Sequence, residues 1–213
     1  MRLVIMGTPG AGKGTQAKLL ADRVGVCHIS TGDMLRDAIR RGTRLGLEAQ
    51  RYMEQGLLVP DDVVIGIVEE RLRAPDCKHG FILDGFPRTL AQARALDELL
   101  ARRGEPLTAV MLIAVPRDEA IRRLAGRRVC DKCGAMSHVA FDPPARADRC
   151  DRCGGGLAQR EDDREDTIRH RMDVYARETA PVLEHYRGAG LLHEIEGTGS
   201  REDVSRRVAA SVG

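Results

Sequence analysis

A glycine-rich segment near the N-terminus has the residue types of a phosphate-binding loop. It reads GTPGAGKGT over residues 7–15, after a short apolar run and ahead of a helical pattern. In that context backbone N–H groups can converge on phosphate oxygens, and the helix N-terminus adds a fixed positive end. Lys13 adds a mobile ammonium group. An ordinary strand-to-helix turn needs neither the lysine nor the framing glycines, so we predict a phosphate site.

The residue beside this lysine departs from the commonest form of the motif. It is Gly14, and the hydroxyl comes one position later, at Thr15. In many nucleotide hydrolases a Ser or Thr beside the lysine binds Mg²⁺ directly. A direct protein ligand for Mg²⁺ is therefore not predicted at this position.

Four cysteines are spaced as zinc ligands. Cys130 and Cys133 form one C-x-x-C pair, Cys150 and Cys153 form another, and residues 134–149 separate them. Two such pairs can supply four thiolates to one Zn²⁺ in a closed, structural site. Disulfides and an empty, degenerate site are the alternatives. His138 lies between the pairs and is expected to be a surface or hydrogen-bonding residue, not an extra ligand.

The expected compartment is the cytoplasm. Only the apolar residues 3–6 follow Arg2 before the glycine loop, which is too short for a signal peptide or a membrane span. In the cytoplasm cysteines are mostly thiols or metal ligands. Cys27 and Cys77 are therefore predicted to be ordinary, isolated thiols.

The composition favours a globular domain without a polyanionic partner. Hydrophobic residues make up 42% and charged residues 31%, with a net charge of +2. A nucleic-acid-binding ATPase with a zinc ribbon would need a basic stripe with stacking aromatics. With 3% aromatic residues and no tryptophan, we expect no nucleic-acid partner, and no membrane partner either.

Apolar runs alternate with helical patterns along most of the chain. Helices are predicted at Lys13–Val24, Leu90–Leu100 and Asp118–Leu124. Such alternation gives right-handed crossovers and a parallel sheet between helices, so the fold class is α/β. The five predicted strands are Leu3–Met6, Cys27–Ser30, Phe81–Leu83, Val110–Ala114 and Leu192–Ile195.

Two segments interrupt this alternation of predicted strands and helices. Residues 31–59 are predicted to be a mostly helical insertion with glycines at its joints. From about 128 to 163 there is no convincing periodicity, which suits a lid stapled by its cysteines. The joint glycines are Gly32, Gly42, Gly46 and Gly56.

Three further motifs extend the pattern: STGDMLR at 30–36, LDGFPRT at 83–89 and GRRV at 126–129. With the phosphate loop they resemble the adenylate kinase family, in family order and over most of the chain, and specifically its long-lid bacterial type. The resemblance implies a P-loop nucleoside monophosphate kinase fold with a five-stranded parallel sheet. Its implied parts are a core at 1–29, 60–127 and 164–213, a helical AMP-binding insertion at 30–59 and a zinc-ribbon-like lid at 128–163.

The resemblance implies an AMP pocket with a cationic grip on the phosphate. Arg36 and Arg88 suit bidentate pairing with phosphate oxygens. Gln92 lies four residues after Arg88, on the same helix face, and its amide can present a donor and an acceptor to adenine. The implied AMP-binding set is Thr31, Arg36, Leu57, Leu58, Val59, Gly85, Phe86, Pro87, Arg88, Gln92, Arg160 and Arg171.

On the ATP side the resemblance implies that Arg123 stacks on adenine and that further arginines converge on the transferred phosphoryl group. The implied ATP-binding set is Gly10, Ala11, Gly12, Lys13, Gly14, Thr15, Arg123, Arg127, Met136, Ser137 and Gly199. The implied catalytic set is Lys13, Arg88, Arg127, Arg160 and Arg171.

Four acidic residues are candidates for holding Mg²⁺ waters or orienting these arginines: Asp33, Asp84, Asp162 and Asp163. The last two lie in a charge run, where a solvated helix start is the alternative. Two departures from the family pattern affect the ATP side. The family often has Lys after Gly-Thr near the last strand, where this chain has Gly199, and an aromatic before the lid histidine, where it has Ser137.

The implied activity is ATP + AMP ⇌ 2 ADP, with Mg²⁺ bound to ATP, a structural Zn²⁺ and a role in adenine nucleotide homeostasis and salvage. The partners would be ATP, AMP and ADP, and the expected state is a monomer. A kinase for UMP, CMP or another monophosphate is the nearest alternative. A redox sensor acting through the lid cysteines is another, but it leaves the phosphate loop unexplained.

Overall fold

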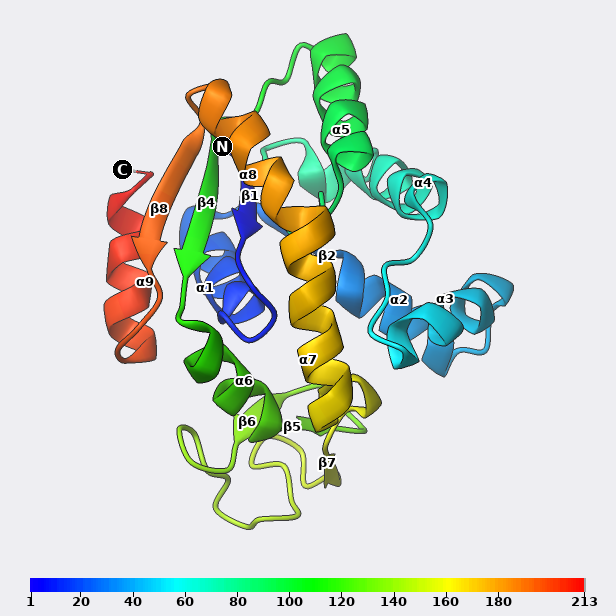
Figure 1. The fold of residues 1–213 in the computed structure, drawn as a ribbon, viewed down its shortest axis with the longest axis vertical. Coiled ribbons are helices and arrows are strands. Elements are labelled where there is room, and N and C mark those ends of the chain that lie inside the picture. Colours follow the sequence, from blue (N-terminus) through cyan, green and yellow to red (C-terminus); the bar gives the residue numbers. More distant parts are fainter. Residues whose placement is uncertain (213) are drawn as a thin grey trace.

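The computed structural model describes residues 1–212 and contains a five-stranded parallel sheet in the order β2-β3-β1-β4-β8 (Figure 1). β1 lies at its centre, with Leu3 opposite Ile82 on one side and Ala109 on the other. The five predicted strands are confirmed within one residue at each end. They are β1 (Arg2–Met6), β2 (Cys27–Ser30), β3 (Phe81–Asp84), β4 (Ala109–Ala114) and β8 (Leu192–Glu196).

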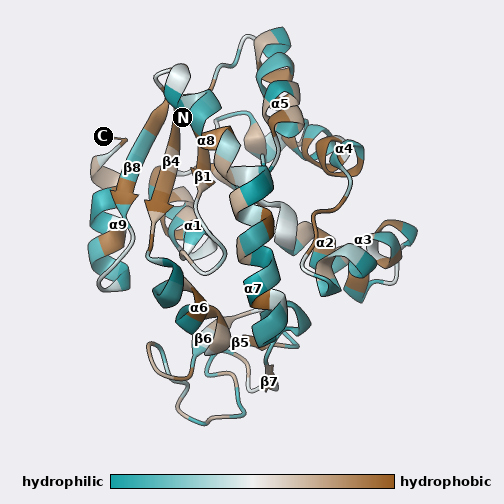
Figure 2. Ribbon diagram, viewed as in Figure 1, coloured by the Kyte–Doolittle hydropathy of each residue, from teal (hydrophilic) through white to brown (hydrophobic). Residues whose placement is uncertain are grey.

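Two hydrophobic clusters cover the two faces of the sheet. Successive side chains of a strand point to opposite faces. Leu3 and Ile5 therefore join one cluster with residues of α1 (Lys13–Val24) and α9 (Arg201–Ala210). Val4 and Met6 join the other cluster. Because both faces are covered, the strands are apolar along their length, as the brown colour of β1 and β4 in Figure 2 shows.

The second cluster is closed by helices from three parts of the chain. These are α4 (Asp61–Leu72), α5 (Leu90–Arg103) and α8 (Ala180–Gly188), which contribute residues such as Val68, Leu96 and Tyr186. α8 continues α7 (Glu165–Val174) through a π-helical turn, η3 (Tyr175–Thr179), so that one long helical rod runs from the lid to the core (Figure 1). α6 (Arg117–Ala125) packs against α7 below the sheet. None of the helices in residues 1–212 has the length and apolar character to cross a bilayer.

The predicted helical insertion is a pair of helices, α2 (Thr31–Arg40) and α3 (Arg44–Glu54). Gly42 and Gly56 lie at its joints, as predicted, and both have positive φ. Gly32 and Gly46 do not, because they lie inside the two helices. At Gly46 a Cβ would collide with the backbone carbonyl of Ala38, so this glycine lets α3 approach α2 closely.

The lid contains regular structure where the sequence shows no periodicity. β6 (Met136–His138), β5 (Arg127–Cys130) and β7 (Leu157–Ala158) form a small antiparallel sheet, followed by the short helix η2 (Glu161–Asp163). Strands of this length cannot show a two-residue period in sequence. In Figure 1 this sheet lies below the carboxyl ends of the central strands, with the α2–α3 pair to one side.

The prediction of isolated thiols at Cys27 and Cys77 is wrong, because the structure joins them in a disulfide. Cys27 opens β2, and Cys77 ends the short helix η1 (Pro75–Cys77). Pairing of β2 with β3 places Cys27 opposite Phe81, only a few residues beyond Cys77. Their Cα atoms are 5.3 Å apart although the chain separates them by 50 residues. The two cysteines are neighbours because β2 lies beside β3 in the sheet. The order of the strands cannot be deduced from the spacing of the cysteines in the sequence.

Candidate active site

The phosphate loop connects β1 to α1 at the carboxyl edge of the sheet, the usual ligand edge of open α/β sheets. Gly10 and Gly12 have φ of 84° and 89°, which favours glycine. The Lys13 ammonium donates to the carbonyl oxygens of Gly7 (2.8 Å) and Thr8 (2.9 Å), so it folds back over the loop. A Cβ at Gly12 would meet no atom within 4 Å, which leaves its surroundings open for a ligand.

Gly14 lies close to the carboxylate of Asp84. A Cβ at this position would lie 3.1 Å from a carboxylate oxygen of Asp84. Asp84 is the last residue of β3 and is buried. Its Oδ2 atom lies 3.8 Å from His28 Nε2. The structure thus brings a carboxylate next to the loop at the point where other phosphate loops carry a hydroxyl.

Cations converge on this edge of the sheet. Burial lowers the pKa of Lys13 to about 7, an effect that Asp84 opposes and Arg88, Arg171 and Arg127 reinforce. Burial, together with Arg171, likewise lowers the pKa of Arg88 to about 10. Positive groups that depress one another's pKa values in this way are arranged to receive an anion.

A cavity beside these cations gathers the residues predicted for AMP. Of that set, only Arg160 does not line it; the cavity walls also include Lys13 and Asp162. Thr31 donates to the Gly85 carbonyl oxygen at 2.9 Å, and Arg88 Nε donates to the same oxygen at 2.8 Å. These bonds tie the start of α2 to the turn after β3.

The Gln92 amide, predicted to contact adenine, is buried and already holds two partners in the cavity wall. Its Nε2 donates to Asp61 at 2.7 Å, and its Oε1 accepts from the Arg88 backbone N–H at 2.8 Å. Thr179, in the π-helical turn, donates to the Arg88 carbonyl oxygen at 2.9 Å. Sequence reasoning missed Asp61 and Thr179, because only the tertiary fold brings them to this wall.

Arg36 of the cavity is paired with Asp33 at 2.6 Å. Although burial acts in the opposite direction, the Arg36 guanidinium holds the pKa of Asp33 below its usual value. Of the two roles considered for Asp33, this geometry is that of an arginine-orienting residue.

The base of the lid is held by a buried carboxylate between two arginines. Asp163 is fully buried and accepts from Arg127 Nε at 2.8 Å and Nη2 at 2.7 Å. Arg171 Nη1 donates to Asp163 at 3.0 Å and lies 3.1 Å from the Asp162 carboxylate. The alternative of a solvated helix start is excluded for Asp163 by this burial.

Arg160 lies near the same arginines but has a different environment. Among the described residues its buried Nε has no hydrogen-bond partner. Burial lowers its pKa to about 9, and Arg36 and Arg127 add to the effect. A buried cation without a bonded anion suits a group that binds a charged ligand.

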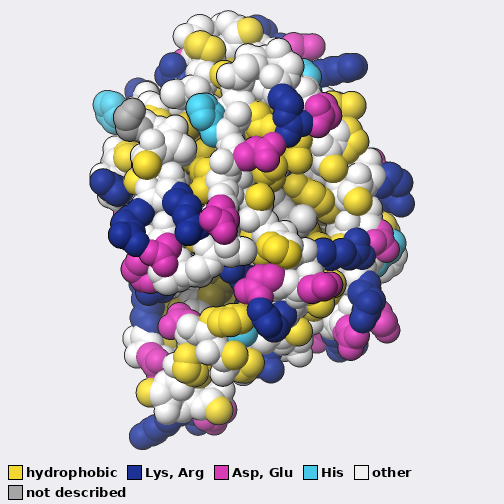
Figure 3. Space-filling view, turned by 60° about the vertical axis from the view of Figure 1, so that its left-hand side comes forward, with side chains coloured by type: hydrophobic (Ala, Val, Ile, Leu, Met, Phe, Trp, Pro, Cys, Tyr) yellow, Lys and Arg dark blue, Asp and Glu magenta, His cyan; other side chains and the backbone are white. Residues whose placement is uncertain are grey.

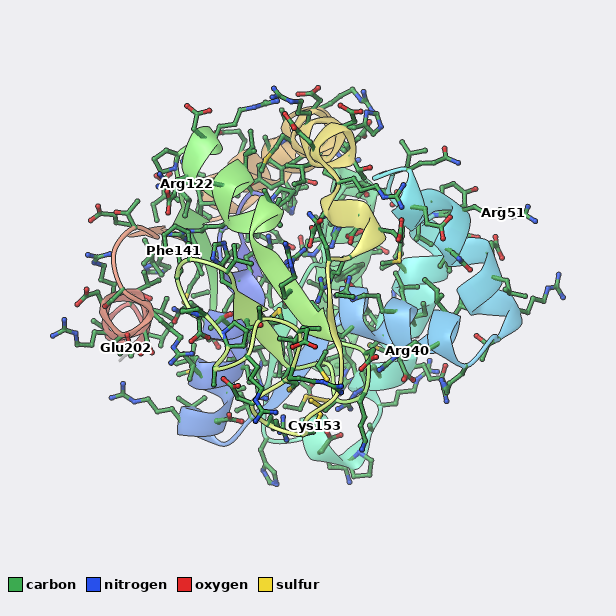
Figure 4. All side chains as sticks on the ribbon, turned by 90° about the horizontal axis from the view of Figure 1, so that it is seen from below. Arg40, Arg51, Arg122, Phe141, Cys153 and Glu202 are labelled. Carbon is green, nitrogen blue, oxygen red and sulfur yellow. A yellow bond between two sulfur atoms is a disulfide. The ribbon has the colours of Figure 1, made fainter. Side chains whose placement is uncertain are left out.

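The residues predicted for the ATP base lie around α6 and the lid edge. Arg123 Nε pairs with Glu119 at 3.0 Å, and its Nη1 donates to the Gly197 carbonyl oxygen at 3.1 Å. That bond draws α6 toward the loop containing Gly199. Met136 and Ser137 lie on β6, with Met136 largely exposed. His138 stacks on Phe141 at a centroid distance of 4.5 Å, and Arg122 lies over the Phe141 ring (Figure 4).

The four lid cysteines form one cluster. Their sulfur atoms all lie within 4.8 Å of one another, with 3.5 Å between Cys130 and Cys153 and 3.7 Å between Cys133 and Cys150. Four sulfurs at 2.3 Å from one Zn²⁺ would be about 3.8 Å apart. Each C-x-x-C turn ends on a glycine at φ 70°, Gly134 or Gly154, whose N–H bonds back to the first cysteine. The donors and their spacing therefore fit zinc.

Comparisons with known proteins all point to one family. The family model for adenylate kinase matches residues 5–191. The chain is 55% identical over 213 residues to an adenylate kinase of Moorella thermoacetica, covering 100% of this chain and 98% of that protein. It is 51% identical over 210 residues to an adenylate kinase of Archaeoglobus fulgidus, covering 99% of this chain and 97% of the relative. The chain is also 56% identical over 204 residues to an adenylate kinase of Carboxydothermus hydrogenoformans, covering 96% of this chain and 95% of that protein.

Proposed function

This chain belongs to the adenylate kinase family of phosphotransferases, and on that premise we propose that it catalyses the reversible, Mg²⁺-dependent reaction ATP + AMP ⇌ 2 ADP. The observation that carries the proposal is one cavity lined both by the cations Lys13, Arg88 and Arg171 and by the buried Gln92 amide. Cations that can hold a phosphate and an amide that can hydrogen-bond a base, in one cavity, suit a nucleoside monophosphate.

Phosphoryl transfer needs alignment and charge stabilisation more than covalent help. In our proposal Arg36 and Arg88 hold the AMP phosphate, and the loop around Lys13 holds the ATP phosphates. Arg127, Arg160 and Arg171 stabilise charge on the transferred group. Asp163 orients two of these guanidiniums, since it accepts from both Arg127 and Arg171.

We propose two nucleotide pockets, one for the acceptor AMP and one for the donor ATP. For AMP, the backbone and apolar walls at 57–59 and 85–87 enclose the base beside Thr31 and Gln92. For ATP, we propose a site between Arg123 and the lid edge, with Gly199 contributing its backbone. The full sets are those predicted above from the resemblance.

Mg²⁺ would be held through water near Asp84. This carboxylate supplies the hard oxygen donors that Mg²⁺ prefers, and it lies next to Gly14 of the phosphate loop. When bound, the ion neutralises phosphate charge. The chain's own contribution is to keep the Asp84 oxygens beside the loop.

Zn²⁺ would be held by the four lid cysteines as a closed structural site. Its part is to order the lid, which would close over ATP and exclude water. We propose the lid at 128–163, the AMP-binding insertion at 30–59 and the remaining segments as core. Cys153 of the lid lies apart from Arg51 of the insertion in Figure 4.

We further propose a monomeric cytoplasmic enzyme that serves adenine nucleotide homeostasis and salvage. One face of the surface carries basic and acidic side chains interspersed, not a single-signed stripe (Figure 3). That distribution supports small-molecule partners over nucleic acid.

The test is a coupled assay for ADP formation from ATP with AMP, UMP, CMP or GMP as acceptor. We expect turnover with AMP to exceed turnover with the other three by orders of magnitude. A higher kcat/KM with UMP or CMP would contradict the proposal, and so would nucleotide turnover that needs no monophosphate.

A further inference from the structure

The Gln92 amide in the cavity wall is held at both ends before any substrate binds. It is 1% exposed. Its nitrogen donates to Asp61 Oδ1 at 2.7 Å, and its oxygen accepts from the backbone N–H of Arg88 at 2.8 Å. Asp61 is the first residue of α4, 31 residues away in sequence.

These two partners define which end of the amide is which. An ionised carboxylate only accepts hydrogen bonds, and a backbone N–H only donates. If the amide were turned over, its NH₂ would face the Arg88 N–H and its oxygen would face the Asp61 carboxylate. Both contacts would then be repulsive, so the polarity of the amide is determined by its surroundings.

Asp61 is itself held in place by the start of α5. Its second oxygen, Oδ2, accepts from Thr89 Oγ1 at 2.9 Å. Thr89 is the N-cap of α5, and the same Oγ1 accepts from the Gln92 backbone N–H at 3.1 Å. The carboxylate therefore has a fixed position relative to the amide that it holds.

Two hydrogen-bonding positions remain on the amide for a ligand: one N–H and one lone pair of Oε1. Adenine offers the matching edge, since its 6-amino group donates and its N1 accepts. Hypoxanthine has the opposite edge, with a 6-oxo acceptor and an N1–H donor. A site with fixed polarity rejects the base whose groups would be left unpaired.

We infer that Asp61 is a positioning residue that sets the preference for AMP over IMP by fixing the polarity of the Gln92 amide. The inference rests on the proposed function, in which this cavity holds the acceptor nucleotide. Asp61 touches neither the base nor the reacting phosphate in this arrangement. It acts only through Gln92.

The test compares Asp61→Leu with Asp62→Leu. Leucine has the shape of aspartate but no acceptor, so the first variant removes the partner of the Gln92 nitrogen. Asp62 is the next residue of α4 and is exposed, so the second variant makes the same change on the same helix turn. We measure kcat/KM for AMP and for IMP at saturating ATP. In Asp61→Leu the ratio of AMP to IMP should fall about tenfold, the scale of one hydrogen bond to a charged group. KM for ATP should not change, and Asp62→Leu should keep the wild-type ratio.

A purely structural role for Asp61 would give a different result. The values of kcat/KM with AMP and with IMP would then fall in proportion, and an unchanged AMP-to-IMP ratio in Asp61→Leu would overturn the inference. Failure of the proposed function is recognised separately, because the wild-type protein would then not use AMP. Asp61→Glu keeps the acceptor and should restore most of the discrimination.

A measurement on the wild-type protein covers the case in which Asp61→Leu does not fold. ¹⁵N relaxation of the Gln92 side chain in the ligand-free protein should show an amide as rigid as the backbone around it. An amide that moves freely until AMP is added would overturn the inference, since its polarity would then be chosen by the ligand.

Discussion

Lys13 donates to the carbonyl oxygens of its own loop, and Arg88 donates to a backbone oxygen of the turn after β3. Both cations are thus positioned by neutral acceptors, which keeps their charge available to phosphate. Sequence motifs predicted both residues, because short motifs record backbone geometry that is local. Asp61 and Thr179 lie outside such motifs, and no local signal could have shown that they hold Gln92 and Arg88.

Removing either of these two cations should slow turnover. Lys13→Ala and Arg88→Ala should each lose about two to three orders of magnitude in kcat, the usual cost of one group that stabilises transition-state charge. Lys18→Ala and Arg94→Ala are the control variants. Lys18 is exposed on α1, the helix that Lys13 begins, and Arg94 is exposed on α5, which begins at Leu90, so that Arg88 precedes the helix and does not lie on it with Gln92 as predicted. Near-normal kcat in Lys13→Ala or Arg88→Ala, with melting temperature unchanged, would remove that residue from the catalytic set.

The buried Lys13 ammonium should make the binding of ATP depend on pH. Burial lowers the pKa of Lys13 to about 7 in the free protein. A bound phosphate favours the charged ammonium and so raises this pKa, and the protein must then take up a proton. At pH 8, where Lys13 is mostly neutral when free, binding of ATP should take up close to one proton. At pH 6 the uptake should be near zero.

Calorimetric titrations in buffers with different ionisation enthalpies give the number of protons taken up. Lys13→Ala is the control, and its uptake at pH 8 should largely disappear. Equal uptake in the wild type and in Lys13→Ala would assign the proton to another group.

At the scale of elements, the continuous apolar runs predicted the central strands because both faces of a parallel sheet are buried. The lid strands β5, β6 and β7 escaped prediction because each is too short to show a period. The Cys27–Cys77 disulfide escaped because it depends on β2 lying beside β3. Gly32 and Gly46 were wrongly predicted to lie at the joints of the insertion. A glycine in sequence can indicate close packing inside a helix as well as a joint between helices, and only the structure distinguishes the two.

The disulfide leads to a stability prediction. It closes a chain segment that contains the whole α2–α3 pair, with a sequence separation of 50 residues. A cross-link of this span stabilises by about 4 kcal/mol in the loop-entropy model. For a chain of this size that corresponds to about 10 °C in melting temperature. Reduction should lower the melting temperature by that order.

Thiol titration of the unfolded, zinc-free protein should find four reactive thiols before reduction and six after it. Because a reductant can also remove zinc from the lid, the double variant Cys27→Ser with Cys77→Ser is the control. Its melting temperature should respond to reductant only through zinc. Six free thiols in the untreated protein would contradict the disulfide.

At the scale of the whole molecule, the lid and the core are stabilised differently. The core has two large hydrophobic clusters, whereas the lid exposes Met136, Val139 and Phe141. So small a segment cannot bury enough apolar surface to offset its ordering entropy. Four thiolates on Zn²⁺ can supply on the order of 10 kcal/mol. The metal should therefore order the lid without entering the chemistry.

Purified protein should contain about one zinc per chain. The double variant Cys130→Ser with Cys133→Ser should lose the metal, melt at a lower temperature and be cleaved faster by proteases within the lid, while the core keeps its far-UV spectrum. Activity should fall only as far as lid order falls. A metal-free protein that is fully ordered yet inactive, and that recovers with zinc without structural change, would show the metal to be catalytic.

In the proposed function, the cavity lined by Lys13, Arg88 and Gln92 is where the γ-phosphoryl group of ATP is transferred to AMP. The most direct test follows the label from [γ-³²P]ATP in the presence of Mg²⁺ and AMP, with Arg88→Ala as the negative control. We predict that the label appears in ADP, that its appearance requires AMP, and that it is slowed by orders of magnitude in the variant. Label released mainly as inorganic phosphate, or transferred at the same rate when AMP is omitted, would contradict the account.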